Sequence, residues 1–167
     1  PDEDTEYRMY EDVAGILGEY GYHQYEISNY ARSGFECRHN KGYWKRMDYL
    51  GLGLGAASLI GKKRFTNTNI MEEYLNHSRD LTGIRKDVEI LEKKDEMGEF
   101  MFLGLRMTEG VSEEEFQEYF HVSVEKIYGR VIEKYIRQGL LEKRNGRIFL
   151  TRRGIHVSNA VMADFLL

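Results

Sequence analysis

The chain has 167 residues with a formal net charge of −4, and 41% of its residues are hydrophobic. This composition suits one large or two small globular domains, and the mild negative charge gives no general case for nucleic-acid binding. No run of about 18 apolar residues predicts a membrane span, and the first residues do not resemble a secretory signal. A single cysteine, Cys37, excludes an internal disulfide and favours a reducing cytoplasm. Because the chain starts at Pro1, we expect a piece of a longer protein.

The first element is a predicted helix that begins at Asp4 or Thr5 and runs to about Tyr20, where Gly21 ends it. Residues 22–30 are rich in aromatic side chains and predict a strand. One face of that strand carries Glu26 and Ser28, which indicates either a ligand cavity or a solvated face. The predicted N-terminal helix has apolar residues at helical spacing, and these predict a buried stripe: Met9, Val13, Ile16, Leu17 and Tyr20.

Residues 31–48 predict a long loop, a feature that is usually functional or disordered. This loop contains Cys37, His39, Tyr43 and Trp44 within eight residues. Imidazole is a common metal ligand, and aromatic faces suit a flat ligand. The alternatives are that His39 bonds within the loop, that Trp44 anchors packing, and that Cys37 is a small, semi-buried apolar residue.

Residues 49–54 predict a strand in which glycines at period two leave one face bare. A hairpin over 58–67 is expected to turn at Gly61, and a short helix capped by Asn69 should reach about Asn76. Glu26 is a further candidate, as a partner for an imidazole or as an ordinary surface carboxylate.

Beyond residue 82 the pattern becomes mostly helical. Helices are predicted over 88–106, from Ser112 and from Ser123 to Gly139, then a hairpin turning at Asn145-Gly146 and a last helix capped by Thr151. This winged-helix-like order predicts a second domain over 86–167 after a first over 1–80, in an α+β fold. A DNA-contacting wing could use the basic residues Lys143, Arg144, Arg147, Arg152 and Arg153. Nearby glutamates disfavour this interpretation.

Several motifs along the chain resemble one family. They are YEISNYAR at 25–32, YLGLG at 49–53, GAAS at 55–58, GLR at 104–106, EGV at 109–111, GLL at 139–141 and LTRRG at 150–154. With them, the chain resembles the C-terminal part of the oxygen-independent coproporphyrinogen III oxidase-like family of radical SAM proteins. Residues 39–44, HNKGYW, are similar to the HNxxYW pattern of its heme chaperone branch, HemW.

The resemblance implies the last β/α elements of a TIM-like radical SAM barrel followed by a helical C-terminal domain. It implies a parent with a 4Fe-4S cluster held by a CxxxCxxC motif and completed by S-adenosyl-L-methionine. Because this chain has only Cys37, the cluster would lie upstream, and the chain alone would be catalytically inactive. Ala31 and Ala57 would lie near the S-adenosyl-L-methionine region. The family often has histidine at the position of Ala57, and the alanine of this chain has no polar group with which to replace it.

The resemblance also implies heme binding through His39 as iron ligand, with Asn40, Tyr43, Trp44 and Cys37 around the porphyrin. The parent would pass heme to acceptor proteins. The alternative within the family is the oxidase itself, which decarboxylates two propionate side chains to vinyl groups. Self-association is expected as well, since a partial barrel leaves sheet edges and apolar faces uncovered.

Overall fold

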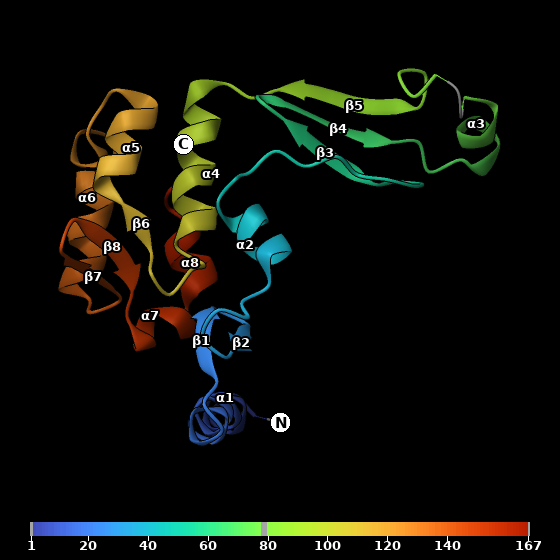
Figure 1. Cartoon of the computed structure of the whole chain (residues 1–167). Coiled ribbons are helices and arrows are strands. Elements are labelled where there is room, and N and C mark those ends of the chain that lie inside the picture. The colour runs from blue at the N-terminus through green and yellow to red at the C-terminus, as the bar shows by residue number, and fades with distance from the viewer. Residues whose placement is uncertain (1, 78–79, 167) are drawn as a thin grey trace.

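A computed structural model describes residues 2–77 and 80–166 as an α+β fold, which confirms the predicted class. A helical C-terminal domain lies on one side, β3, β4, β5 and α3 project from it as an arm, and α1 lies at the far end (Figure 1). The elements of the N-terminal part are α1 (Glu3–Glu19), β1 (His23–Glu26), β2 (Asn29–Ala31), α2 (Arg38–Trp44), β3 (Ala57–Ile60), β4 (Lys63–Asn67), α3 (Met71–Asn76) and β5 (Arg85–Ile90). The C-terminal domain contains α4 (Lys93–Gly104), β6 (Val111–Ser112), α5 (Glu113–Phe120), α6 (Val124–Arg137), β7 (Leu141–Arg144), β8 (Arg147–Leu150), α7 (Arg152–His156) and α8 (Ser158–Ala163).

Helix α1 forms where predicted, but its cap and its burial differ from the prediction. Asp2, not Asp4 or Thr5, caps the helix by accepting a hydrogen bond from the Thr5 amide at 2.8 Å. The predicted inward stripe is largely exposed, with Met9 and Ile16 each more than half accessible. The spacing of the apolar residues was correct, but no element of the described structure covers them.

Residues 22–30 form a hairpin instead of one strand. The Glu26 carboxylate accepts hydrogen bonds from the Ser28 amide and the Asn29 side chain, and these bonds close the turn between β1 and β2. A carboxylate that bonds its own backbone two residues later acts like an Asx turn, so the strand reverses there. Glu26 is fully buried, so the expectation of an ordinary surface carboxylate was wrong.

The predicted loop at 31–48 contains helix α2, whereas the predicted strand at 49–54 does not form. Only Tyr49 makes a bridge there, to Leu59 on β3. A side chain on Gly51 would lie 2.2 Å from the Ala57 carbonyl oxygen, so the glycine allows the two backbones to touch. The bare face marked a close backbone approach, not a strand of a sheet.

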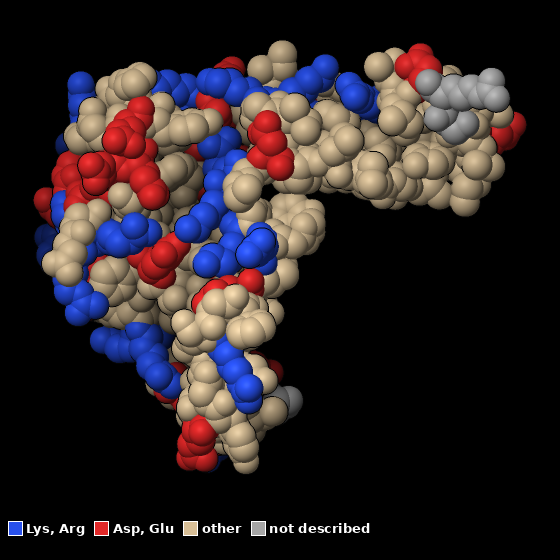
Figure 2. All heavy atoms as spheres, viewed as in Figure 1, with Lys and Arg blue, Asp and Glu red and all other residues tan. Residues whose placement is uncertain are grey.

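The arm is an antiparallel sheet in the order β3-β4-β5, with α3 at its tip. Its hairpin turns at Gly61, as predicted, with a left-handed φ of 59°. Helix α3 forms, but no side chain caps it: Ile70 lies at the cap, and Thr68 accepts from the Ile70 amide. In Figure 2 the lower face of the arm carries almost no charge, and several of the arm's large apolar side chains are exposed.

The helix predicted over 88–106 is shorter, because β5 occupies 85–90 and pairs with β4. A capping box between Glu92 and Asp95 starts α4 at Lys93. The predicted division into domains over 1–80 and 86–167 stays a prediction. Residues 1, 78–79 and 167 of these two ranges lie outside the described structure.

The helices and the hairpin of the C-terminal domain occur in the predicted order, whereas the winged-helix-like character stays a prediction. Ser112, Ser123 and Thr151 each cap the following helix through their hydroxyl oxygen, and Asn145-Gly146 makes a two-residue turn with φ of 52° and 71°. The last helix is divided into α7 and α8 at Val157. Strand β6 joins the hairpin in a sheet of order β6-β8-β7. The core of this domain is apolar, and its fully buried side chains include Met101, Leu105, Phe116, Phe120, Tyr128, Ile148, Val161, Met162 and Phe165.

Within the described ranges, no helix combines the length and apolarity needed to cross a bilayer.

Candidate functional site

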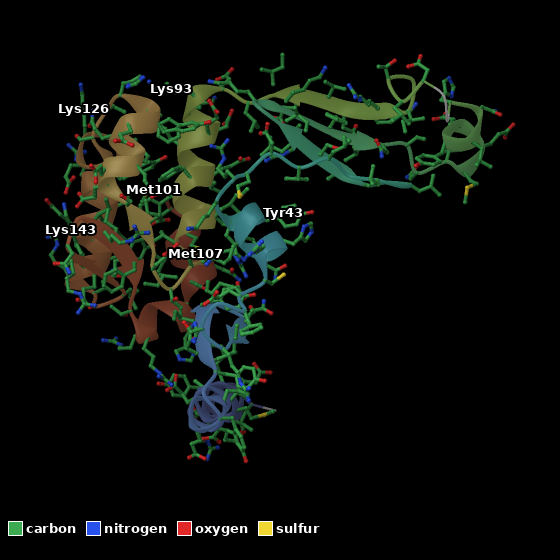
Figure 3. All side chains as sticks on the ribbon, viewed as in Figure 1. Tyr43, Lys93, Met101, Met107, Lys126 and Lys143 are labelled. Carbon is green, nitrogen blue, oxygen red and sulfur yellow. The ribbon has the colours of Figure 1, made fainter. Side chains whose placement is uncertain are left out.

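Helix α2 presents the HNxxYW residues on two different faces. His39 and Tyr43 are four residues apart, so they lie together on one face, and Asn40 and Trp44 lie together on the next. The His39 ring meets Tyr43 edge-on with ring centroids 4.6 Å apart, and Tyr43 meets Tyr49 in the same way at 4.6 Å. Figure 3 shows Tyr43 pointing away from the C-terminal domain. His39 and Tyr43 therefore form an outward pair.

His39 is exposed, and in the part of the chain that the structure describes its ring makes no hydrogen bond. It borders an open pocket of about 150 Å³. Ligand pockets usually span about 300–1,000 Å³, so this pocket is a shallow surface depression and not an enclosed cavity. The pocket is lined by Arg38, His39, Gly42, Tyr43, Met47, Asp48 and Tyr49.

Trp44 faces inward and packs against a small buried cluster of Tyr25, Ala31 and Met107. The Arg106 guanidinium lies 4.2 Å from the centre of its ring. With one face under Arg106 and the ring packed on the cluster, Trp44 has the surroundings of a packing anchor. Figure 3 shows Met107 on the side of α2 that faces the C-terminal domain.

The other predicted site residues are distributed as follows. Cys37 lies at the N-cap of α2 and is exposed, not semi-buried. Asn40 is partly buried on α2. Ala31 is buried beside Trp44, whereas Ala57 is exposed on β3, in a different sheet, opposite Thr66. Their predicted place near S-adenosyl-L-methionine stays a prediction.

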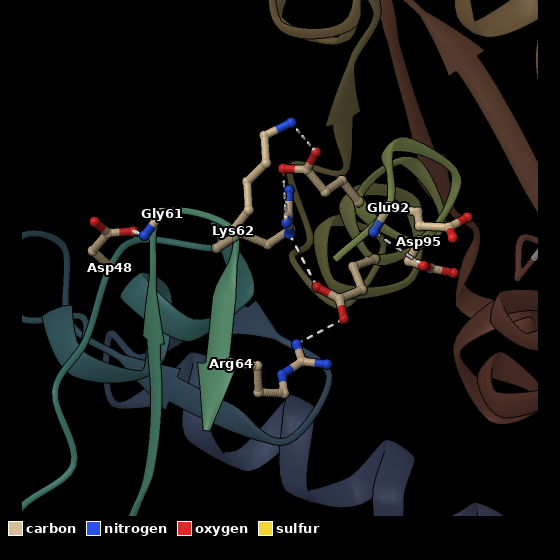
Figure 4. Close-up of polar contacts among 9 residues, drawn as sticks. Asp48, Gly61, Lys62, Arg64, Glu92 and Asp95 are labelled. Carbon is tan, nitrogen blue, oxygen red and sulfur yellow. Dashed lines mark hydrogen bonds and ion pairs between the residues drawn. The ribbon is translucent and has the colours of Figure 1, made fainter. Parts of the chain in front are cut away.

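A network of charges around the buried side chains of Arg46 and Glu96 fixes the end of α2 to the C-terminal domain. Arg46, whose side chain is 6% exposed, lies 3.2 Å from the Glu99 carboxylate and 3.7 Å from that of Glu96 on α4. Lys62 and Arg64 reach in from the arm and meet the same two carboxylates, each at 2.7 Å (Figure 4). Arg46 also has a left-handed backbone, with φ of 53°. One ionic cluster therefore joins α2, the arm and α4.

A second, more exposed ion pair joins the C-cap residue of α2 to the same domain. Lys45 lies 2.8 Å from Glu109. Burial works against ionisation of Glu109, but the hydrogen bond and charge of Lys45 outweigh it and hold the pKa of Glu109 below its usual value.

Glu26 and Arg106 complete the junction beneath Trp44. The Glu26 carboxylate lies 3.7 Å from the Arg106 guanidinium, and its side chain is fully buried. The backbone joins the same two segments, because the Ile27 amide donates to the Arg106 carbonyl at 3.0 Å and the Thr108 amide donates to Tyr25 at 3.2 Å. The expected partnership of Glu26 with an imidazole is absent among the described contacts.

Sequence patterns did not reveal Glu96 or Glu99 as site residues, nor the acidic partners of Arg46 and Arg106. The members of each pair lie more than 30 residues apart along the chain, and no local spacing encodes such pairs. The GLR motif at 104–106 marked Arg106.

The described residues contain no group of three or more histidine, cysteine, aspartate or glutamate side chains that could hold a metal ion. An iron–sulfur cluster needs several thiolates. Since the whole sequence has one cysteine, its residues do not fit a 4Fe-4S cluster.

Comparisons with known proteins agree with this fold. Residues 91–157 match the model of the HemN C-terminal domain. The structure superimposes with a TM-score of 0.76 on coproporphyrinogen III oxidase (HemN) from Escherichia coli, a radical SAM enzyme, covering 99% of this chain and 42% of that one at 14% identity. The chain is therefore similar, in sequence and fold, to the C-terminal part of the oxygen-independent coproporphyrinogen III oxidase-like family of radical SAM proteins.

Over its whole length the chain is also similar to curated relatives named heme chaperone HemW. It is 40% identical to the heme chaperone HemW of Lactococcus lactis subsp. lactis (strain IL1403), covering 100% of this chain and 44% of the relative. It is 34% identical to HemW of Bacillus subtilis (strain 168), covering 99% of this chain and 44% of that relative. The chain therefore spans less than half the length of these curated relatives.

Proposed function

We propose that this chain is the heme-presenting part of a HemW-like heme chaperone, in which heme is the cargo. His39 ligates the heme iron, and Tyr43 and Tyr49 contact the porphyrin beside it. Arg38 borders the same pocket, where a guanidinium suits an anionic propionate. In this assignment Trp44 and Asn40 support the helix from within and do not stack on the cargo.

The observation that carries this proposal is the state of the His39 ring. It is exposed, makes no hydrogen bond within the described residues and stands beside an open aromatic surface. A neutral imidazole with a free ring nitrogen binds heme iron well. Buried histidines that serve structure have their nitrogens engaged instead.

A heme titration followed by the Soret band tests the proposal. We expect His39→Ala to weaken heme binding about tenfold or more, because the variant loses an iron ligand. A tenfold change in affinity corresponds to about 1.4 kcal/mol. His23→Ala is a matched control, since His23 is also exposed but pairs with Glu36 at 3.1 Å. Equal Soret shift and affinity in His39→Ala and the wild type would refute the ligand assignment.

Cys37 provides the second arm of that titration, because thiolate also binds heme iron. We expect Cys37→Ala to keep the wild-type Soret position. A spectrum that changes only in Cys37→Ala would identify Cys37, and not His39, as the iron ligand.

The 4Fe-4S cluster and S-adenosyl-L-methionine belong, in this proposal, to the part of the parent that this chain does not represent. The relatives' family supports both groups in the parent. The exposed apolar faces of α1 and of the arm would then be covered by that remaining part, or by a second copy of the chain. Heme-accepting proteins as partners, and the cytoplasmic location, stay predictions.

The alternatives have less support. The oxidase shares the fold, but the relatives at 34–40% identity over the whole chain are named heme chaperones. Nucleic-acid binding through the β7–β8 hairpin finds little support, because most of the basic side chains there are engaged: Lys143 with Glu113 and Glu125, Arg144 with Glu142, Arg147 with the backbone of Glu109 and Gly110, and Arg152 with Glu11.

A further inference from the structure

Beneath the outward pair of α2 lies a row of three side chains from three separate segments. Glu26 comes from β1, Arg106 from the segment after α4, and Trp44 from the end of α2. Glu26 lies 3.7 Å from the Arg106 guanidinium, which in turn lies 4.2 Å from the centre of the Trp44 ring. The exposed fractions of the Glu26 and Arg106 side chains are 0% and 21%.

One buried polar atom of each member has no hydrogen-bond partner among the described residues: Glu26 Oε2, Arg106 Nε and Trp44 Nε1. Buried polar atoms are normally satisfied, so three such atoms in one place need an explanation. Here the guanidinium is engaged through its face and its charge: it covers the indole ring as a cation–π partner while it faces the carboxylate. The carboxylate can hold that cation in place because two bonds, from the Ser28 amide and the Asn29 side chain, already fix its other oxygen.

We infer that Arg106, oriented by Glu26, is the positioning residue for Trp44, and that the row Glu26–Arg106–Trp44 sets the angle at which α2 presents His39 and Tyr43. Trp44 is one residue from Tyr43 and five from His39 on the same short helix, so the packing of the indole fixes the orientation of the helix and with it that of the outward pair. The inference deepens the proposed function and rests on it for the consequence at the heme. The positioning itself is independent of heme.

The chain offers a direct reporter, because Trp44 is its only tryptophan. Acrylamide quenching of tryptophan emission measures how well the indole is covered. Glu26→Gln keeps an oxygen that accepts from Ser28 and Asn29 but removes the charge that faces Arg106. Arg106→Met keeps an unbranched apolar stem and removes the guanidinium.

We expect both variants to raise the quenching constant of Trp44 and to weaken heme binding about tenfold, within the range of a cation–π contact out of water. Glu26→Gln should add no further quenching in the Arg106→Met background, because Glu26 acts through Arg106. The matched control is Arg85→Met, which removes a guanidinium 4.5 Å over the Phe65 ring on the arm and should leave both readings unchanged.

Unchanged Trp44 quenching in both folded single variants, or quenching that adds fully in the double variant, would overturn the inference. Increased quenching with wild-type heme affinity would equally refute the positioning role. Wild-type heme affinity in His39→Ala would refute the proposed function instead, and the Trp44 quenching data alone would then decide whether Arg106 positions the indole. Circular dichroism confirms that each variant is folded, and Arg106→Lys, which keeps the charge but not the flat face, replaces Arg106→Met if that variant unfolds.

Discussion

The core of the C-terminal domain consists of apolar side chains, whereas its contact with the N-terminal part combines a small apolar cluster around Trp44 with buried charges. Within the domain, residues between Met97 and Phe165 form one cluster of buried hydrophobic side chains. At the junction, Arg46 lies between Glu96 and Glu99, and Arg106 faces Glu26. The apolar stripe of α1, by contrast, is exposed.

This difference shows that two regions of one chain can be held together by different kinds of interaction. Apolar burial is not directional and stabilises the domain in proportion to its buried area. Buried ion pairs add little net stability, but they penalise every arrangement that separates the charges. The junction is therefore specific in orientation, which is what the proposed presentation of α2 at a fixed angle requires.

The largest effect is expected in the apolar core. Phe116 is fully buried, with its ring centroid 4.7 Å from that of Phe120 and 5.5 Å from that of Phe100. We expect Phe116→Ala to lower the free energy of unfolding by about 3–5 kcal/mol, because the cavity cannot fully collapse. Urea unfolding followed by circular dichroism measures it. Tyr119→Ala is the control: this neighbouring side chain is 58% exposed, and its loss should cost below about 1 kcal/mol. Similar losses in the two variants would show that the core is not the main source of stability.

A smaller effect is expected from breaking the charged junction. Glu96 is 1% exposed and accepts from Lys62 beside Arg46. We expect Glu96→Ala to cost about 3 kcal/mol, because Arg46 stays buried with one of its two carboxylates gone. Trp44 emission during urea unfolding reports this junction.

The control for Glu96→Ala is Glu109→Ala, which removes the half-exposed partner of Lys45 and should cost about 0–1 kcal/mol. If the two glutamate variants lose the same stability, burial of the Arg46 network has no special weight, and the contrast drawn above is wrong.

The smallest effect at neutral pH concerns a polar atom inside the apolar core. Burial raises the pKa of Tyr128 to about 12, and its hydroxyl has no hydrogen-bond partner among the described residues. In the unfolded chain a tyrosine loses its proton near pH 10, so stability is complete below about pH 10 and falls as the pH rises toward about 12. We expect Tyr128→Phe to change stability by less than about 1 kcal/mol at neutral pH and to reduce that alkaline loss. Unfolding curves of both proteins between about pH 8 and pH 11 test this, and parallel losses would contradict it.

The sequence predicted the C-terminal domain better than the N-terminal part. Caps at Ser112, Ser123 and Thr151 and the turn at Asn145-Gly146 are local signals, and the structure confirms each of them. In the N-terminal part, tertiary contacts overrode the local pattern. A buried carboxylate reversed the strand at Glu26, and pairing with β4 made a strand of residues that had predicted a helix.

The candidate site was found from its motif but not from its supports. His39, Tyr43 and Trp44 stand out as residue types, and α2 holds all three. Their division into outward and inward pairs required the helix itself, because a loop has no faces. The charges that fix α2 come from distant segments, and a single sequence without relatives offers no spacing from which to infer them.

Arg46 illustrates two conflicting demands on one position. Its φ of 53° costs an ordinary residue roughly 1–2 kcal/mol, and glycine would remove that cost. Glycine, however, would leave the carboxylates of Glu96 and Glu99 without the cation that lies between them. Substitution to glycine thus exchanges backbone relief for electrostatic loss, while lysine keeps the charge but not the forked geometry that reaches two carboxylates. The position has few acceptable replacements, and mutational tolerance should be narrow there even though Arg46 touches no cargo.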